Sequence, residues 1–194
     1  MDSSKSRKSG IASACRVKEF FLDKLTSGLK MVGRAIKAVL RAKYVIFDNW
    51  YGASFEFIKG MIAGGLTVVC AVPLNRNCIH LQQSINISKV LAFLKNSKKP
   101  KKCAARTLRY YEAEIEMPKL GKVKLCLCRK VKHKEWKAII SKDSTMSALA
   151  IMEVYALRWS IEVFFKEAKD GQTPVDRLRR SVRICHSIDG RYKN

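Results

Sequence analysis

The residues with the clearest chemical potential lie in one stretch near the end of the chain, EVYALRWSIEVFFKEAKDG. Four of its polar residues are Tyr155, Arg158, Glu162 and Lys169. On a helix they fall within an arc of about 60°, and Lys166 shares that face. A carboxylate framed by cations and a phenol could bind a metal ion and phosphates. The alternative is a set of exposed i,i+4 ion pairs, each worth about 0.3–0.5 kcal/mol.

A second carboxylate, Asp48, follows a short apolar run over residues 44–47 that is typical of a buried strand. Open α/β sheets bind ligands at the carboxyl ends of their strands. We therefore expect the carboxylates of Asp48 and Glu162 to lie about 4–7 Å apart and to share a divalent cation. The alternative for Asp48 is a turn or capping aspartate before Asn49.

The elements that would position Asp48 form a βαβ unit. In chain order the pattern predicts a helix over 19–42, a strand over 44–48, a helix over 53–63 and a strand over 66–72. The two strands should be parallel and covered on both faces. Residues 75–106 are less regular, with a helical turn over 90–94. The charge run over 95–102 is either a solvated loop or a contact to the DNA backbone.

The segment that precedes the Glu162 helix is rich in predicted strand. Residues 109–117 and 122–128 alternate between apolar and polar side chains, which predicts an antiparallel hairpin with one wet face. Cys126 and Cys128 fall on the wet face. Residues 136–140 could add a third strand. Helical periodicity resumes at about residue 144 and continues to about 169. Its apolar packing stripe is Val154, Leu157, Ile161, Phe164 and Ala168.

Charge sets this chain apart from most soluble domains of similar size. Its 194 residues contain 39 Lys and Arg against 16 Asp and Glu, a net charge of +23. Such a surplus favours an anionic partner, above all nucleic acid, although a ribosomal or anionic-membrane surface would also suit it. No apolar run reaches the roughly 20 residues of a membrane span, and the first residues do not resemble a secretion signal. The seven cysteines are then expected to be cytosolic thiols without a zinc site.

Two motifs together resemble the DDE transposases of insertion-sequence family four. One is Asp48-Asn-Trp-Tyr51 after a strand, and the other is the Tyr155-x2-Arg158-x3-Glu162-x6-Lys169 spacing. A β-rich insertion separates such motifs in that family. The resemblance covers residues 27–170 and implies an α/β, RNase H-like catalytic core that carries this insertion.

The resemblance also implies a function and a role for each matching residue. The family cuts and joins DNA at transposon ends with two Mg²⁺ or Mn²⁺ ions. Asp48 and Glu162 would be the catalytic metal ligands. Tyr155, Arg158, Lys166 and Lys169 would contact DNA. Trp136 resembles, weakly, an aromatic residue on which a flipped base stacks, although the residue pattern favours a tryptophan in the hairpin core.

Two departures from the family pattern change what we expect of this chain. The first catalytic Asp and the opening strands of the family have no counterpart before Asp48, so residues 44–47 should form an exposed, aggregation-prone edge. The segment 171–194 is rich in arginine and does not continue the family's helix.

We therefore divide the chain into five parts. They are a basic segment 1–26, a partial RNase H-like core 27–106, a β-rich insertion 107–143, a catalytic-Glu helix 144–170 and an atypical tail 171–194. The expected protein is a truncated transposase, inactive by itself, that binds double-stranded DNA in the cytoplasm at the nucleoid. A homo-oligomer on DNA is one form that it could take. The alternative is a non-enzymatic nucleic-acid-binding protein or an inhibitor of transposition.

Overall fold

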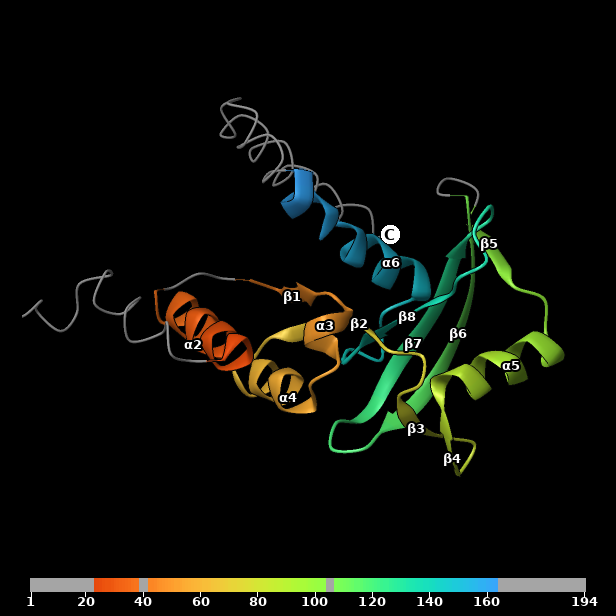
Figure 1. The fold of residues 1–194 in the computed structure, drawn as a ribbon, viewed down its shortest axis with the longest axis horizontal. Helices are drawn as coiled ribbons and strands as arrows, with labels where there is room; N and C mark the ends of the chain where they lie inside the picture. The colour runs from red at the N-terminus through yellow and green to blue at the C-terminus, as the bar shows by residue number, and fades with distance from the viewer. Residues whose placement is uncertain (1–22, 39–41, 104–106, 164–194) are drawn as a thin grey trace, which may run out of the picture.

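The computed structural model describes residues 23–38, 42–103 and 107–163, and a single mixed sheet organises them (Figure 1). Eight strands form this sheet, and seven of them follow the spatial order β1-β2-β8-β7-β6-β3-β4. The strands are β1 (Tyr44–Phe47), β2 (Thr67–Val72), β3 (Asn77–His80), β4 (Gln83–Asn86), β5 (Lys101–Cys103), β6 (Leu108–Met117), β7 (Gly121–Lys130) and β8 (Lys137–Ser141). The fold class is therefore α/β with a mostly antiparallel sheet.

The predicted parallel pair is confirmed, and it is the one parallel pairing in the described sheet. β1 pairs with β2 in a register that places Tyr44 opposite Thr67 and Phe47 opposite Cys70. The connection between them holds two helices instead of the one predicted, α3 (Asn49–Gly52) and α4 (Phe55–Ala63). The division has a local cause, because Asp48 caps α3 and Ser54 caps α4.

The predicted hairpin and third strand are also confirmed. β6 pairs antiparallel with β7, and β7 pairs antiparallel with β8. β8 also pairs with β2, so the segment predicted as an insertion continues the same sheet as the βαβ unit. The prediction that Cys126 and Cys128 lie on a wet face is wrong. Both are buried beneath α6 (Ala148–Ala156), because this helix covers the face that alternation alone assigned to solvent.

Residues 75–103 contain more regular structure than the sequence predicts. β3 and β4 form a short hairpin, and the expected helical turn is part of α5 (Ile87–Ser97). The expectation of an exposed loop over 95–102 is wrong in part, because it contains the end of α5 and the start of β5, which pairs with β6. Lys101 and Lys102 remain exposed on that strand.

The helix that carries the Tyr-Arg-Glu motif is interrupted. α6 ends at Ala156, and the amides of Leu157 and Arg158 bond to carbonyls three residues back. This tighter turn interrupts the helix that was expected to reach residue 169, and helical structure resumes over 159–163, where the described residues end. The expected apolar stripe is partly buried, since Val154 is buried while Ile161 is 53% exposed. The rest of the predicted helix lies outside the described residues, Phe164 and Ala168 included.

Apolar side chains cover both faces of the sheet. On one face α4 and α5 pack against Leu125, Leu127 and Ile140, with α2 (Lys24–Lys37) packed outside α4. On the other face α6 covers Val69, Cys126 and Ile139. Figure 1 shows α6 and α4 on opposite sides of β1 and β2. Parallel strands with both faces covered match the continuous apolar sequence of β2.

β1 forms one edge of the described sheet, as expected. The expectation that Phe47 would be uncovered is wrong, because it is 7% exposed and its ring lies 5.2 Å from that of Phe57. Tyr44 and Ile46 are half-buried against the α6 face. None of the helices in the described ranges has the length and apolar character of a membrane span.

Candidate active site

One cavity of about 710 Å³ brings together five residues that the sequence singled out. These are Asp48, Trp136, Tyr155, Arg158 and Glu162. The cavity lies where β1 and β2 end, next to the start of β8 and the end of α6. The remaining wall consists of Asn49, residues 71–75, Lys137 and Ala138. The carboxyl ends of the two parallel strands therefore meet the residues of the Tyr-Arg-Glu motif.

The backbone that follows β1 fixes the Asp48 carboxylate. Its Oδ1 accepts hydrogen bonds from the amides of Trp50 at 3.0 Å and Tyr51 at 3.3 Å. The capping alternative is thus observed, and it coexists with a place on the cavity wall. Both bonds reach Oδ1, so Oδ2 has no hydrogen bond in the described structure. A fixed carboxylate with one oxygen available is suited to hold a cation.

A very close helix–strand approach fixes α3 itself. A Cβ added to Gly52 would lie 1.8 Å from the carbonyl oxygen of Ala71 in β2. Only glycine fits there without displacing backbone. The amide of Gly52 also donates to the carbonyl of Asp48 at 2.9 Å. The position of Asp48 therefore depends on how tightly this short helix lies against β2.

The opposite wall is formed by Tyr155, Arg158 and Glu162. Arg158 Nη1 donates to Glu162 Oε1 at 2.5 Å, and the guanidinium lies 5.9 Å from the centre of the Tyr155 ring. The side chains of Arg158 and Glu162 are 25% and 43% exposed. The i,i+4 ion pair of the alternative reading is therefore present, and it also lies on the cavity wall.

The electrostatics link the two walls through Tyr155. Burial raises the pKa of Tyr155, Arg158 opposes the shift, and the charge of Asp48 adds to it. Burial alone would lower the pKa of Arg158, but its interactions with Glu162 and Tyr155 outweigh burial and raise that pKa. Tyr155 therefore remains a neutral phenol that can donate a hydrogen bond, beside a guanidinium that stays charged.

Trp136 belongs to the core as well as to the cavity. Its ring lies 5.3 Å from that of Tyr111 at an interplanar angle of 30°, and it packs against the larger apolar cluster. The cations of Arg129 and Lys95 lie 5.2 Å and 5.5 Å from its centre. The core reading is thus observed, while stacking on a base stays a prediction.

Some site residues were missed, and others fall outside the described part of the chain. Lys166 and Lys169 lie outside the described residues. Lys137 was missed, although it lines this cavity and a second one of about 610 Å³ that also reaches Tyr155. Lys137 directly precedes the apolar residues of β8. This position at the start of a predicted strand is the sequence signal that could have identified it as a site residue. Asn49 was named only as the neighbour of Asp48.

The acids on this cavity suit one divalent cation better than two. Asp48 and Glu162 are the two acids on its described wall. Within residues 23–38, 42–103 and 107–163, no group of three or more His, Cys, Asp or Glu side chains could hold a metal. One Mg²⁺ bound by two carboxylates, with water or phosphate oxygens completing its shell, matches these donors. A pair of metal ions would need more than these two acidic ligands.

The family comparison identifies the class of protein. Residues 26–183 match the transposase DDE domain family, and because this is most of the chain, the protein belongs to that family. Membership implies a role in transposition and binding to DNA. No curated protein matches the chain significantly.

Proposed function

We propose that this protein is a transposase domain of the insertion-sequence family four type, with Asp48 and Glu162 as its metal-binding acids. One observation carries the proposal. Residues from the two sequence motifs, far apart along the chain, line a single cavity. The parallel β1–β2 pair with its helical crossover supports an RNase H-like core, in which Asp48 occupies the carboxyl end of a strand.

Each residue of the cavity would have a defined part in binding a DNA end. Asp48 and Glu162 would hold one Mg²⁺ or Mn²⁺, which when bound supplies Lewis-acid activation of phosphodiester chemistry. Arg158 would neutralise a phosphate, and Lys137 lies on the same wall to bind another. The phenol of Tyr155 would donate a hydrogen bond to a phosphate or sugar oxygen. For Lys166 and Lys169, which lie outside the described residues, the proposed contact with DNA rests on the sequence motif alone.

We further propose that these residues alone bind DNA without cutting it. Cutting and joining in this family relies on three carboxylates and two metals, whereas the described wall supplies two carboxylates. Two acids that hold one ion leave either the attacking or the leaving oxygen without a metal. The chain would then bind DNA as a homo-oligomer and need another acid for catalysis.

A combined binding and nicking experiment tests this proposal. The full chain is titrated against a fluorescent DNA duplex at several KCl concentrations, and separately incubated with supercoiled plasmid and Mg²⁺ or Mn²⁺. We expect salt-sensitive binding and no nicking. Nicking that disappears in Asp48→Asn would show that the site is complete and would overturn the inactivity. Nicking that survives in both Asp48→Asn and Glu162→Gln would overturn the site.

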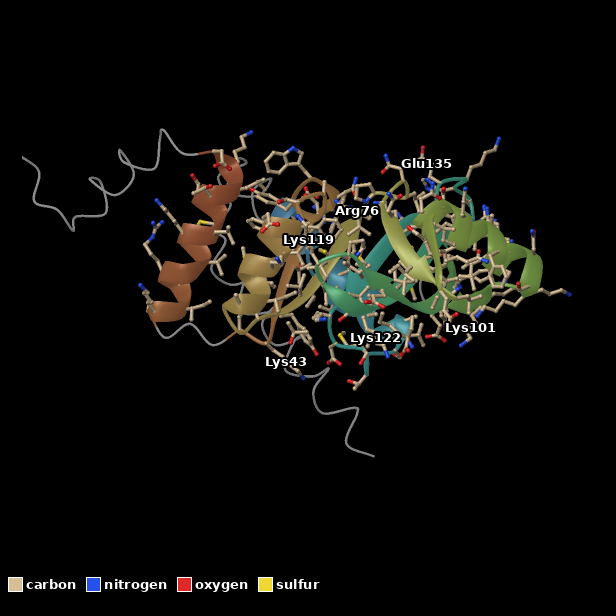
Figure 2. All side chains as sticks on the ribbon, turned by 90° about the horizontal axis from the view of Figure 1, so that it is seen from below. Lys43, Arg76, Lys101, Lys119, Lys122 and Glu135 are labelled. Atoms are coloured by element: carbon tan, nitrogen blue, oxygen red, sulfur yellow. The ribbon has the colours of Figure 1, made fainter. Side chains whose placement is uncertain are left out.

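A second candidate function is a purely DNA-binding protein that inhibits transposition. The observation in its favour is the net charge of +23, to which exposed lysines such as Lys101 on β5, Lys122 on β7 and Lys119 in the turn between β6 and β7 contribute (Figure 2). Metal binding separates the two functions. An inhibitor that uses only its basic surface should gain no DNA affinity from Mg²⁺, because Mg²⁺ then acts only as a competing counterion, and it should tolerate Asp48→Asn.

A further inference from the structure

Arg76 lies in the loop between β2 and β3 (labelled in Figure 2) and is not among the residues that line the cavity. Its Nη2 donates to the carbonyl oxygen of Gly52 at 3.2 Å and also to that of Ala53. Its guanidinium lies 4.2 Å from the centre of the Phe55 ring. The side chain thus reaches across from one loop to the junction of α3 and α4.

The backbone of Arg76 is held as firmly as its side chain. Its amide donates to the carbonyl of Pro73 at 3.1 Å, and its carbonyl accepts from the amide of Ile87 at 2.9 Å. The first of these bonds closes a turn over 73–76, and residues 73–75 lie on the cavity wall. Arg76 therefore connects two separate walls, the 73–75 turn and the α3 segment that begins at Asp48.

The two carbonyls that Arg76 binds lie at the C-terminal end of α3. The last carbonyls of a helix have no hydrogen-bond partner within that helix. A cation there is favoured by the helix dipole and by charge-assisted hydrogen bonds. Because α3 is one turn long, its two ends cannot move independently. Asp48 caps the first end, and Gly52 connects back to the carbonyl of Asp48.

We propose that Arg76 is a positioning residue that holds the Asp48 carboxylate in place by clamping α3 to the β2–β3 loop. It acts through α3, because its Nη2 binds two protein carbonyls at the end of that helix. Burial lowers the pKa of Arg76, but a guanidinium remains charged at any physiological pH. The clamp itself does not depend on the proposed function. Only its consequence for metal binding rests on the proposed role of Asp48 as a metal ligand.

Hydrogen exchange tests the clamp without reference to a metal. In the full chain, Arg76→Gln should speed amide exchange in residues 49–53 about tenfold and leave α5 unchanged, because charge-assisted bonds are lost at one end of α3. Arg76→Lys keeps the charge and can still donate to a carbonyl, so it should restore most of the protection. Unchanged exchange at 49–53 in Arg76→Gln would overturn the proposal.

Arg129→Gln is a matched control, since Arg129 also donates to a backbone carbonyl, that of His133 at 3.0 Å, and also stacks on an aromatic ring. It should leave exchange at 49–53 unchanged. If Arg76→Gln does not fold, Arg76→Lys replaces it and should show a smaller but local rise in exchange at 49–53 at an unchanged urea midpoint. A rise spread evenly over the chain in Arg76→Lys would contradict the clamp.

Mn²⁺ affinity tests the consequence for the site. Arg76→Gln should weaken Mn²⁺ binding about tenfold, the lower end of the effect seen when residues that orient a metal ligand are changed. In a chain that already carries Asp48→Asn, adding Arg76→Gln should cause no further loss of Mn²⁺ affinity. Equal Mn²⁺ affinity in the wild type and Asp48→Asn would reject the proposed metal site, and the exchange data would still decide the clamp. A further loss in the Asp48→Asn background would mean that Arg76 acts by another route.

Discussion

The two acidic residues of the cavity are held in opposite ways. Asp48 follows a strand whose last residue is buried, caps a helix seated directly on β2, and has one oxygen fixed by two backbone amides. Glu162 lies beyond the turn that interrupts its helix, is 43% exposed, and is bonded to Arg158. The first wall is set by backbone packing, and the second by a single side-chain pair.

This difference suggests how the site could respond to DNA. A phosphate that binds Arg158 competes with Glu162 for the same guanidinium, because both are anions. Glu162 would then be released beside Asp48, whose position does not change. The fixed wall would thus define where a cation binds, and the adjustable wall would respond to the substrate. Substitutions of residues on either wall can therefore test the two walls separately.

The largest effect should come from breaking the fixed wall at Gly52. Gly52→Ala places a Cβ 1.8 Å from the Ala71 oxygen, so α3 must move away from β2. We expect a loss of about 3 kcal/mol in the free energy of unfolding, in the range of severe overpacking. Urea denaturation measures it.

Gly33→Ala is the matched control for this substitution. Gly33 lies within α2, and an added Cβ would have nothing within 4 Å. Alanine favours the helix, so this variant should be unchanged or more stable by up to about 1 kcal/mol. Equal destabilisation by both alanines would show that α3 is not seated on β2 as described.

Asp48 can be used to separate capping from metal binding. Asp48→Ala should lower the free energy of unfolding by about 1 kcal/mol because the cap of α3 is lost, whereas Asp48→Asn should preserve stability because asparagine caps equally well. Both should lose Mn²⁺ binding. Urea denaturation and Mn²⁺ titration of the two variants give the answer, and an equally unstable Asp48→Asn would argue against the capping role.

The adjustable wall should affect DNA binding more than stability. Arg158→Ala should reduce the slope of log affinity against log salt by about 0.9, the value of one phosphate contact, and change stability by less than about 1 kcal/mol. Without a divalent metal, Glu162→Gln should strengthen DNA binding, because it removes the anion that competes for Arg158. Fluorescence anisotropy in a KCl series measures both.

Lys59→Ala is a suitable control for the salt series. Lys59 is an exposed cation on α4 and does not line the cavity. It should reduce the slope less than Arg158→Ala does. If the two alanine variants gave the same slope, Arg158 would contribute only general charge.

The smallest effect concerns alkaline pH. The pKa of Tyr155 is raised in the folded protein, so ionisation favours the unfolded chain. The stability that Tyr155 contributes is present below about pH 10, its ordinary value, and is lost as the pH rises through the higher folded value. Tyr155→Phe should therefore lose less stability than the wild type between neutral pH and pH 11 in urea melts. If stability declined equally with pH in Tyr155→Phe and in the wild type, groups other than Tyr155 would be responsible for the decline.

The elements around Asp48 were predictable because their sequence signals are local. The apolar run 44–47 and the run in β2 report strands buried on both faces, and Gly64-Gly65 marks the end of α4. The β6–β7 hairpin was predictable from its alternating pattern. The motifs predicted that Asp48 and Glu162 come together, and both line one cavity. Their sharing of a metal ion stays a prediction.

What escaped prediction depends on contacts between distant segments. The burial of Cys126 and Cys128 follows from α6 lying over them, which alternation within the strand does not encode. β5 exists because β6 offers it an edge, in a run whose lysines suggest a loop. Arg76 reaches carbonyls more than twenty residues earlier, and no local pattern marks such a bond. Backbone acceptors are the same at every position, so a sequence cannot indicate which one an arginine will find.

The most direct test of the site is a calorimetric Mn²⁺ titration of four full-length chains: wild type, Asp48→Asn, Glu162→Gln and the double variant. If both carboxylates hold one cation, the wild type should bind one tight ion per chain. Each single variant should lose at least tenfold in affinity, and the double variant should be little weaker than the weaker single one. Equal Mn²⁺ binding by the wild type and the double variant would show that Asp48 and Glu162 do not form a metal site.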